Sequence, residues 1–283
     1  MINLVRGLLN KFNLRLIKLS KKEISFSNEL ENPLTFLINE SESNEFIFNT
    51  PISSVRSWGG RKLDLNLNPF VDIMLELNNS KHPIYKESAL YKLSGIRKCK
   101  NASDTMGVNS DYFSKLAPHL AVFPWDKVNP KLKIYNQTNT LKKELIKYLQ
   151  PSTSLDLLLK PEIRGEAEIK RIQFIYNSIL KNGFSNNQSN FEPLEGQLLV
   201  TKENKWVVLI RHGEHRIAAL KTLGYKSAPI LIRKYNIIRE SEVNYWWQVL
   251  EKRIDSKSAI KLFNNIIRGD QSAPLINIVG YFI

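Results

Sequence analysis

Residues 211–232 read RHGEHRIAALKTLGYKSAPILI, and this stretch decides the fold that the sequence predicts. A glycine, an acid, a histidine and an arginine stand at the four consecutive positions 213–216. The apolar run WVVLIR ahead of them predicts a strand, RIAALKTLGY predicts a helix, and APILIRK predicts another strand with an edge-like start at Pro229. Charged residues bury poorly, so their place between a strand and a helix indicates a site.

Helix and strand patterns alternate on both sides of this stretch. Upstream, PEIRGEAE (161–168) leads into a predicted helix that Gly183 caps, with one apolar face made of Ile169, Ile172, Ile175, Tyr176 and Ile179. Further strands are predicted at 154–160 and 196–201, and further helices at 241–252 and 256–267. Together these segments predict an α+β fold.

The first half of the chain predicts a mixed α+β region. Short apolar runs predict strands at 23–27, 33–38 and 45–50. Pro69 opens a predicted helix over 69–79, and shorter helices are predicted at 87–96, 110–120 and 141–149. The polar turn formers PSTS (151–154) mark a domain boundary. We therefore expect a helix at 1–22, an N-terminal region at 23–153 and a C-terminal domain at 154–283.

The net charge indicates the kind of partner, and the cysteine content excludes some kinds of site. The 283 residues carry a formal net charge of +14, which attracts anions such as nucleic acid, anionic lipid, nucleotides or acidic glycans, although a lysine-rich source would give the same excess. Cys99 is the only cysteine, so an intrachain disulfide and a cysteine-based zinc site are excluded. The lone cysteine suits a reducing compartment, and we expect a cytoplasmic protein.

Residues 1–22 predict a basic amphipathic helix. Its apolar positions Leu4, Val5, Leu8, Leu9, Phe12 and Leu16 recur at helical spacing, and no acid precedes Glu23. Such a helix binds an anionic membrane surface, with each cation contributing about 1 kcal/mol. The alternative is that the apolar face packs on the protein's own core. Under the first interpretation the protein lies peripherally at the inner face of the membrane.

The turn at 213–216 has the chemistry of a phosphate site. A strand that ends in glycine and leads into a helix presents unpaired backbone N–H groups and the positive end of the helix dipole. Gly213 allows close approach, Arg216 can fork onto phosphate oxygens, and His215 can donate a further hydrogen bond. Glu214 either points toward Mg²⁺ or acts as a first-turn acid. The alternative is a local ion pair between Glu214 and Arg216 with a packed His215.

The region from about Leu155 to Lys234 resembles the ParB/sulfiredoxin-like domain. The matching pieces are PEIRGEAEIKRIQFIYNSILKNGF (161–184), GQLLV (196–200) and the G-x-x-R box in residues 209–232. In that family the box contacts the triphosphate of CTP in chromosome-partitioning members, and ATP in sulfiredoxin and the free-serine kinases. The resemblance implies a ParB-like C-terminal domain that binds ATP or CTP with Mg²⁺ through Gly213, His215 and Arg216. We also expect Glu214, Arg171 and His212 at the nucleotide, with a partly buried strand-end histidine as the alternative for His212.

Departures from the family pattern favour its kinase branch. Glu214 stands where sulfiredoxin has its catalytic cysteine, and no helix-turn-helix DNA reader follows the box, so sulfinic acid reduction and DNA binding are disfavoured. The kinases use an upstream carboxylate as base, where this chain offers Glu162, Glu166 and Glu168. Glu168 is the first choice because Arg171 lies nearly one helical turn after it, and Glu166 is the second. Each could instead be a solvated first-turn acid.

The whole chain is also similar in outline to ParB-like proteins encoded among bacterial surface-polysaccharide genes. The similarity lies in the basic leading helix, a PFV segment at 69–71, a PW dipeptide at 124–125 and the G-x-H-R box. It implies a cytoplasmic role near the membrane in the modification of a glycan or its precursor. Taken with the kinase branch, we expect a nucleotide-dependent phosphotransferase that acts on a hydroxyl of a small molecule or glycan precursor. The alternative is a non-catalytic CTP- or ATP-gated module that recruits a partner. Tyr245, Trp246 and Trp247 could stack on a sugar, although aromatics in a helix more often pack in a core.

Overall fold

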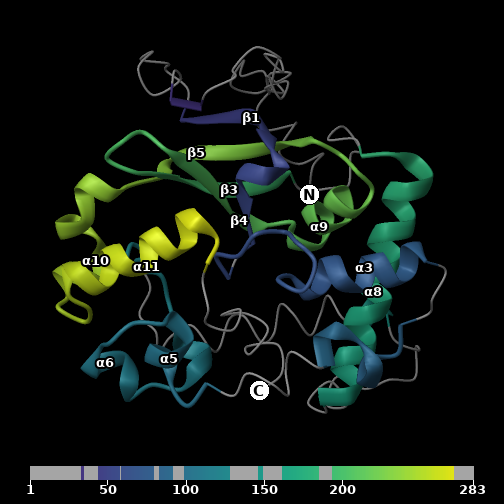
Figure 1. The fold of residues 1–283 in the computed structure, drawn as a ribbon, viewed down its shortest axis with the longest axis horizontal. Coiled ribbons are helices and arrows are strands. Elements are labelled where there is room, and N and C mark those ends of the chain that lie inside the picture. Colours follow the sequence, from purple (N-terminus) through teal and green to yellow (C-terminus); the bar gives the residue numbers. More distant parts are fainter. Residues whose placement is uncertain are drawn as a thin grey trace, which may run out of the picture.

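The computed structural model describes residues 33–34, 44–57, 59–79, 83–91, 99–127, 146–148, 161–184 and 193–270. These residues form an α+β fold in which a mixed five-stranded sheet carries helices on both faces (Figure 1). The predicted helix at 1–22, the strands at 23–27 and 154–160 and the boundary at 151–154 lie outside the described residues. Among the described helices, none has the length and apolar character that crossing a bilayer requires.

The sheet has the strand order β1-β5-β3-β4-β2. The strands are β1 (Glu45–Pro51), β2 (Val55–Arg56), β3 (Leu194–Val200), β4 (Trp206–His212) and β5 (Ser227–Arg239). Antiparallel β3 and β4 form a hairpin, β5 runs parallel to β3 and antiparallel to β1, and β2 runs parallel to β4. The strands predicted at 45–50, 196–201, 206–211 and 228–234 are confirmed.

Pro229 differs from its prediction as the start of an edge strand. It lies in β5, which pairs with β1 on one side and with β3 on the other, so β5 is an interior strand. A proline cannot donate a backbone hydrogen bond, which confines it to places where a ladder bond is not needed. Pro229 satisfies this condition because the pairing of β5 with β3 begins one residue later, at Ile230.

One face of the sheet packs against α3 (Pro69–Asn78), α8 (Pro161–Asn182) and α9 (Glu214–Thr222). Figure 1 shows these three helices gathered on the same side of the molecule. Val208 and Ile210 of β4 point into this core, as expected from the two-residue period of a strand. The helices predicted at 69–79 and after 168 are confirmed, and Gly183 takes the predicted left-handed cap conformation with a φ of 71°.

The other face, toward which Val207 and Leu209 point, packs against α5 (Ala102–Met106), α6 (Asp111–Ser114), α10 (Trp247–Leu250) and α11 (Ser256–Arg268). The continuous helix predicted at 241–252 is wrong. The segment is a 3-10 turn followed by α10, and Trp246 between them has extended backbone (φ −67°, ψ 137°). Trp246 is buried edge-on against Trp125 with a centroid distance of 5.3 Å, and this packing turns the backbone inward.

Short 3-10 segments complete the described chain: Ile52–Ser54, Tyr85–Glu87, Pro118–Leu120, Ile146–Tyr148 and Glu240–Tyr245. Pro33 and Leu34 are helical, so at these two residues the predicted strand 33–38 is wrong. Of the helix predicted at 141–149, the structure describes the 3-10 segment alone.

The regions 23–153 and 154–283 share one sheet, since β1 and β2 come from the first and the other strands from the second. Both hydrophobic clusters also draw residues from both regions. The division expected at residue 153 therefore does not separate two hydrophobic cores. The composition of the 151–154 segment indicates a turn, but it carries no information about long-range strand pairing.

Candidate phosphate-binding site

The turn from β4 to α9 is built around Gly213. This residue is the N-cap of α9 and has a φ of 93°, a left-handed conformation that favours glycine. Since glycine has no side chain, the N-cap position of α9 supplies no side-chain hydrogen bond to the first-turn N–H groups. The first intrahelical bond runs from the Ile217 N–H to the Gly213 carbonyl, 3.0 Å away. The N–H groups of the first turn, at residues 214–216, therefore lie ahead of the hydrogen-bonded helix, where helices bind anions.

The guanidinium of Arg216 folds back over Gly213. A Cβ atom added to Gly213 would lie 2.9 Å from Arg216 Nη2 and would also collide with the side chain of Leu194. Arg216 Nη2 donates to the main-chain carbonyl of Pro193 over 3.4 Å, and Arg216 is half-buried. The first turn of α9 and an arginine fork thus occur at one point, which is the arrangement expected for phosphate.

His215 is paired with Glu168 beneath this turn. Its Nε2 lies 2.8 Å from Glu168 Oε1, and the exposed fractions of the two side chains are 8% and 3%. The ring of Phe70 packs edge-on against the imidazole, with 4.4 Å between centroids. His215 is therefore held between α8 and α3, which agrees with the alternative of a packed histidine, and its contact with a nucleotide stays a prediction.

Arg171 lies near the other oxygen of Glu168. Its Nη1 is 3.8 Å from Glu168 Oε2, as the spacing of three residues on α8 predicts. Burial raises the pKa of the Glu168 carboxyl, but His215 and Arg171 more than offset this effect and hold the pKa below its ordinary value. Glu168 is therefore a buried carboxylate that protein groups neutralise, as buried charges require.

The remaining predicted residues lie elsewhere. Glu166 and Glu162 are exposed on α8, and the structure does not bring Glu166 to His215. His212 is exposed at the end of β4, and Glu214 is half-buried in the first turn of α9. Glu214 lies in the first turn of α9, which is where a first-turn acid is expected.

A metal site built from three or more His, Cys, Asp and Glu side chains is not found among the described residues. Nucleotide-dependent enzymes often bind Mg²⁺ mainly through the phosphates, with one or two carboxylates. Glu214 therefore stays a prediction as a ligand of Mg²⁺ bound with a nucleotide.

Sequence reasoning missed the contribution of α3 to this site. Phe70 contacts His215, and the α3 helix packs on both α8 and α9. Asn68 caps α3 by accepting hydrogen bonds from the N–H groups of Phe70 and Val71. The sequence does contain the N-cap signal, Asn followed by Pro, but it does not show which helices this one contacts.

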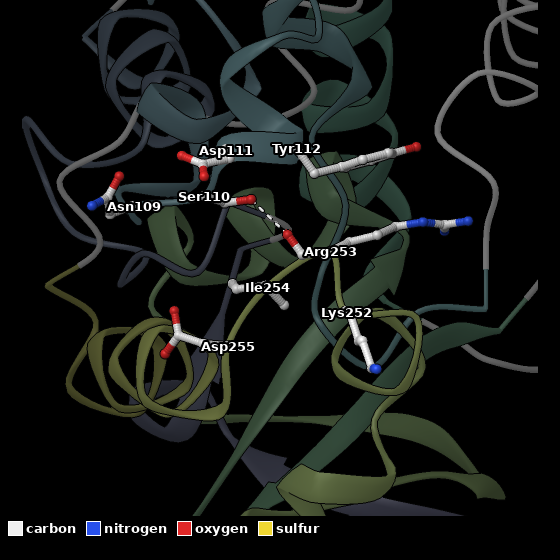
Figure 2. A pocket seen from close by; sticks show the side chains of 8 residues that line it. All are labelled: Asn109, Ser110, Asp111, Tyr112, Lys252, Arg253, Ile254 and Asp255. Carbon is white, nitrogen blue, oxygen red and sulfur yellow. Dashed lines mark hydrogen bonds between the residues drawn. The ribbon is translucent and has the colours of Figure 1, made fainter.

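A polar cavity lies elsewhere, between residues 109–112 and 252–255, with a volume of about 300 Å³ (Figure 2). Ser110 joins its two walls by donating to the carbonyl of Arg253 over 2.6 Å. The Arg253 guanidinium packs over the Tyr112 ring, and Asp255 caps α11. These side chains hold the walls together, and the exposed surface around them is not organised toward a ligand.

Comparisons with protein-family models, with curated proteins and with solved structures found no match to this chain.

Proposed function

We propose that this protein is a ParB-like nucleotide-dependent phosphotransferase that binds the phosphates of ATP or CTP at the N-terminus of α9. The observation that carries the proposal is the position of the Arg216 guanidinium over Gly213, at the first turn of a helix. Backbone N–H groups, the helix dipole and a guanidinium each stabilise negative charge, and together they are the usual means of holding a polyphosphate.

The proposed acceptor is a hydroxyl of a small molecule or of a surface-glycan precursor. Phosphoryl transfer depends mainly on aligning the phosphates and stabilising their charge, and it needs little covalent chemistry from the protein. Mg²⁺ bound with the nucleotide would supply part of that charge stabilisation. Arg216 would hold phosphate oxygens, and the glycine at 213 gives the Arg216 side chain the room to lie at the first turn of α9. Of the two predicted bases, Glu166 is open to solvent, whereas Glu168 is enclosed.

The second candidate is a non-catalytic module that closes on CTP or ATP and recruits a partner or a membrane surface. The enclosure of Glu168 favours this candidate, because a carboxylate in contact with His215 and Arg171 does not face an acceptor hydroxyl. Both candidates share the phosphate site and differ only in turnover. Nucleic-acid binding is disfavoured, since its support is the net charge of +14 alone.

The binding test is titration calorimetry of ATP and CTP with Mg²⁺ against the wild type and Arg216→Ala. Removal of one guanidinium–phosphate contact should weaken binding about 10- to 100-fold. Arg268→Ala is the matched control, because Arg268 is exposed at the far end of α11 and pairs with Asp270. Unchanged nucleotide affinity in Arg216→Ala would show that the phosphate site is misplaced.

The turnover test separates the two candidates. Wild type and Glu166→Gln are incubated with ATP or CTP and Mg²⁺, with and without sugar and polyol acceptors, and release of ADP or CDP is followed. Acceptor-dependent release identifies a phosphotransferase, and its loss in Glu166→Gln assigns the base. Tight binding without release identifies the gated module.

A further inference from the structure

The contact between His215 and Glu168 restricts the orientation of the imidazole ring. Imidazole Nε2 lies 2.8 Å from the carboxylate, and the edge contact with Phe70 holds the ring from another helix. His215 and Glu168 are both buried, and Arg171 Nη1 lies 3.8 Å from the second carboxylate oxygen. The imidazole is thus fixed by residues of α8 and α3 while it belongs to the first turn of α9.

The contact with Glu168 determines which ring nitrogen faces the carboxylate. A neutral imidazole carries its proton on one nitrogen only, and the hydrogen bond that the ring makes to the protein selects that nitrogen. Because Nε2 lies 2.8 Å from the Glu168 carboxylate, a neutral imidazole would carry its proton on Nε2. Removal of the carboxylate would free the ring to rotate and to change tautomer.

We infer that Glu168 is a positioning residue that acts through His215, holding the imidazole in one orientation at the phosphate site instead of serving as the base that contacts an acceptor. The inference rests on the proposed nucleotide site. It assigns to the buried carboxylate of α8 the part that carboxylates play behind metal-bound histidines, where they fix the tautomer and the direction of the ring. Glu168 would then position His215, and Arg171 would pair with the other oxygen of Glu168.

The test compares Glu168→Gln with Glu168→Met in the full chain. Both substitutions remove the charge and keep the volume, but only glutamine keeps an oxygen that can accept from Nε2. We expect Glu168→Gln to bind MgATP or MgCTP within about threefold of the wild type, and Glu168→Met to bind about 10- to 100-fold more weakly. Nitrogen NMR of His215 should show the Nε2–H tautomer in wild type and Glu168→Gln and its loss in Glu168→Met.

A double-mutant cycle with His215→Ala provides the decisive measurement. If Glu168 acts through His215, Glu168→Met has less than about a twofold effect on nucleotide affinity once the imidazole is absent. An equal loss in both backgrounds, or no loss in either, overturns the inference. Arg216→Ala keeps the two proposals apart: if it weakens binding and Glu168→Met does not, the positioning role fails and the phosphate site stands. If Arg216→Ala has no effect, the phosphate site itself fails.

Discussion

Arg56 on β2 donates from Nε to the main-chain carbonyl of Ile266, a residue 210 positions later in the chain, over 3.1 Å. Its Nη2 donates to the next carbonyl, Ile267, and its Nη1 donates to the carbonyls of Ser53 and Val55. Carbonyls in the last turn of a helix lack intrahelical partners, and this buried guanidinium donates to two of them in α11, one of which also accepts from the backbone N–H of Gly269. It joins the edge of the sheet to the last described helix.

Arg56→Met should therefore destabilise the fold by about 2–4 kcal/mol, because it removes several hydrogen bonds of a buried guanidinium. The measurement is urea unfolding followed by circular dichroism. Arg268→Met is the control, since the Arg268 side chain is 57% exposed and its loss should cost less than about 0.5 kcal/mol. Equal losses in the two variants would contradict a bridging role for Arg56.

A second prediction concerns Gly213. Gly213→Ala places a Cβ against Leu194 and 2.9 Å from Arg216 Nη2, in backbone with a φ of 93°. Gly224→Ala is the matched control, since Gly224 has a φ of 82° and a Cβ there meets nothing within 4 Å. The control should lose about 1 kcal/mol from backbone strain alone, and Gly213→Ala about 2–3 kcal/mol together with nucleotide affinity. If Gly213→Ala and Gly224→Ala have equal unfolding midpoints, and Gly213→Ala binds nucleotide as tightly as the wild type, the Cβ at position 213 is accommodated without displacing Arg216.

The local parts of this site could be predicted from the sequence, and the pairing at its centre could not. The order of α8, β3, β4, α9 and β5 follows from hydrophobic periods and from glycine positions, which are local signals. The contact of His215 with Glu168 joins residues 47 positions apart on different helices, and the single sequence has no feature that specifies such a contact.

The sequence predicts in part which of Glu166 and Glu168 is buried. Glu168 stands four residues before Ile172, on the buried face of α8, whereas Glu166 stands four residues before the exposed Lys170. Residues four apart share a helix face, so the pattern places Glu168 inside and Glu166 outside. The sequence does not show that Glu168 contacts His215. It therefore does not distinguish a buried, paired carboxylate from a catalytic one.

A third prediction concerns residues 1–22, which lie outside the described part of the chain. Their basic residues should hold the protein on vesicles that contain phosphatidylserine and release it at high salt, since each cation contributes about 1 kcal/mol near an anionic surface. Flotation of the full chain and of a form without residues 1–22 measures this, with neutral phosphatidylcholine vesicles as control. Equal flotation of both forms removes the membrane role, and a lower unfolding midpoint in the shortened form would place the helix on the protein's own core.

The last prediction follows from the charge state of Glu168. Burial raises the pKa of this carboxyl, but the nearby His215 and Arg171 outweigh that effect, so in the folded protein the pKa lies below its ordinary value of 4.5. The folded state then binds fewer protons at this group than the unfolded state does. The stabilisation is complete above the unfolded pKa and is lost as the pH falls through the folded pKa.

Glu168→Gln should therefore be less stable than the wild type near neutral pH and should lose less stability than the wild type as the pH falls below about 4.5. Urea unfolding between about pH 3 and pH 6 measures both slopes. Glu166→Gln makes the same change of charge on the exposed face of the same helix, and it should keep the acid slope of the wild type. If Glu168→Gln and wild type lose stability in parallel across this range, Glu168 is not held as a carboxylate by His215 and Arg171.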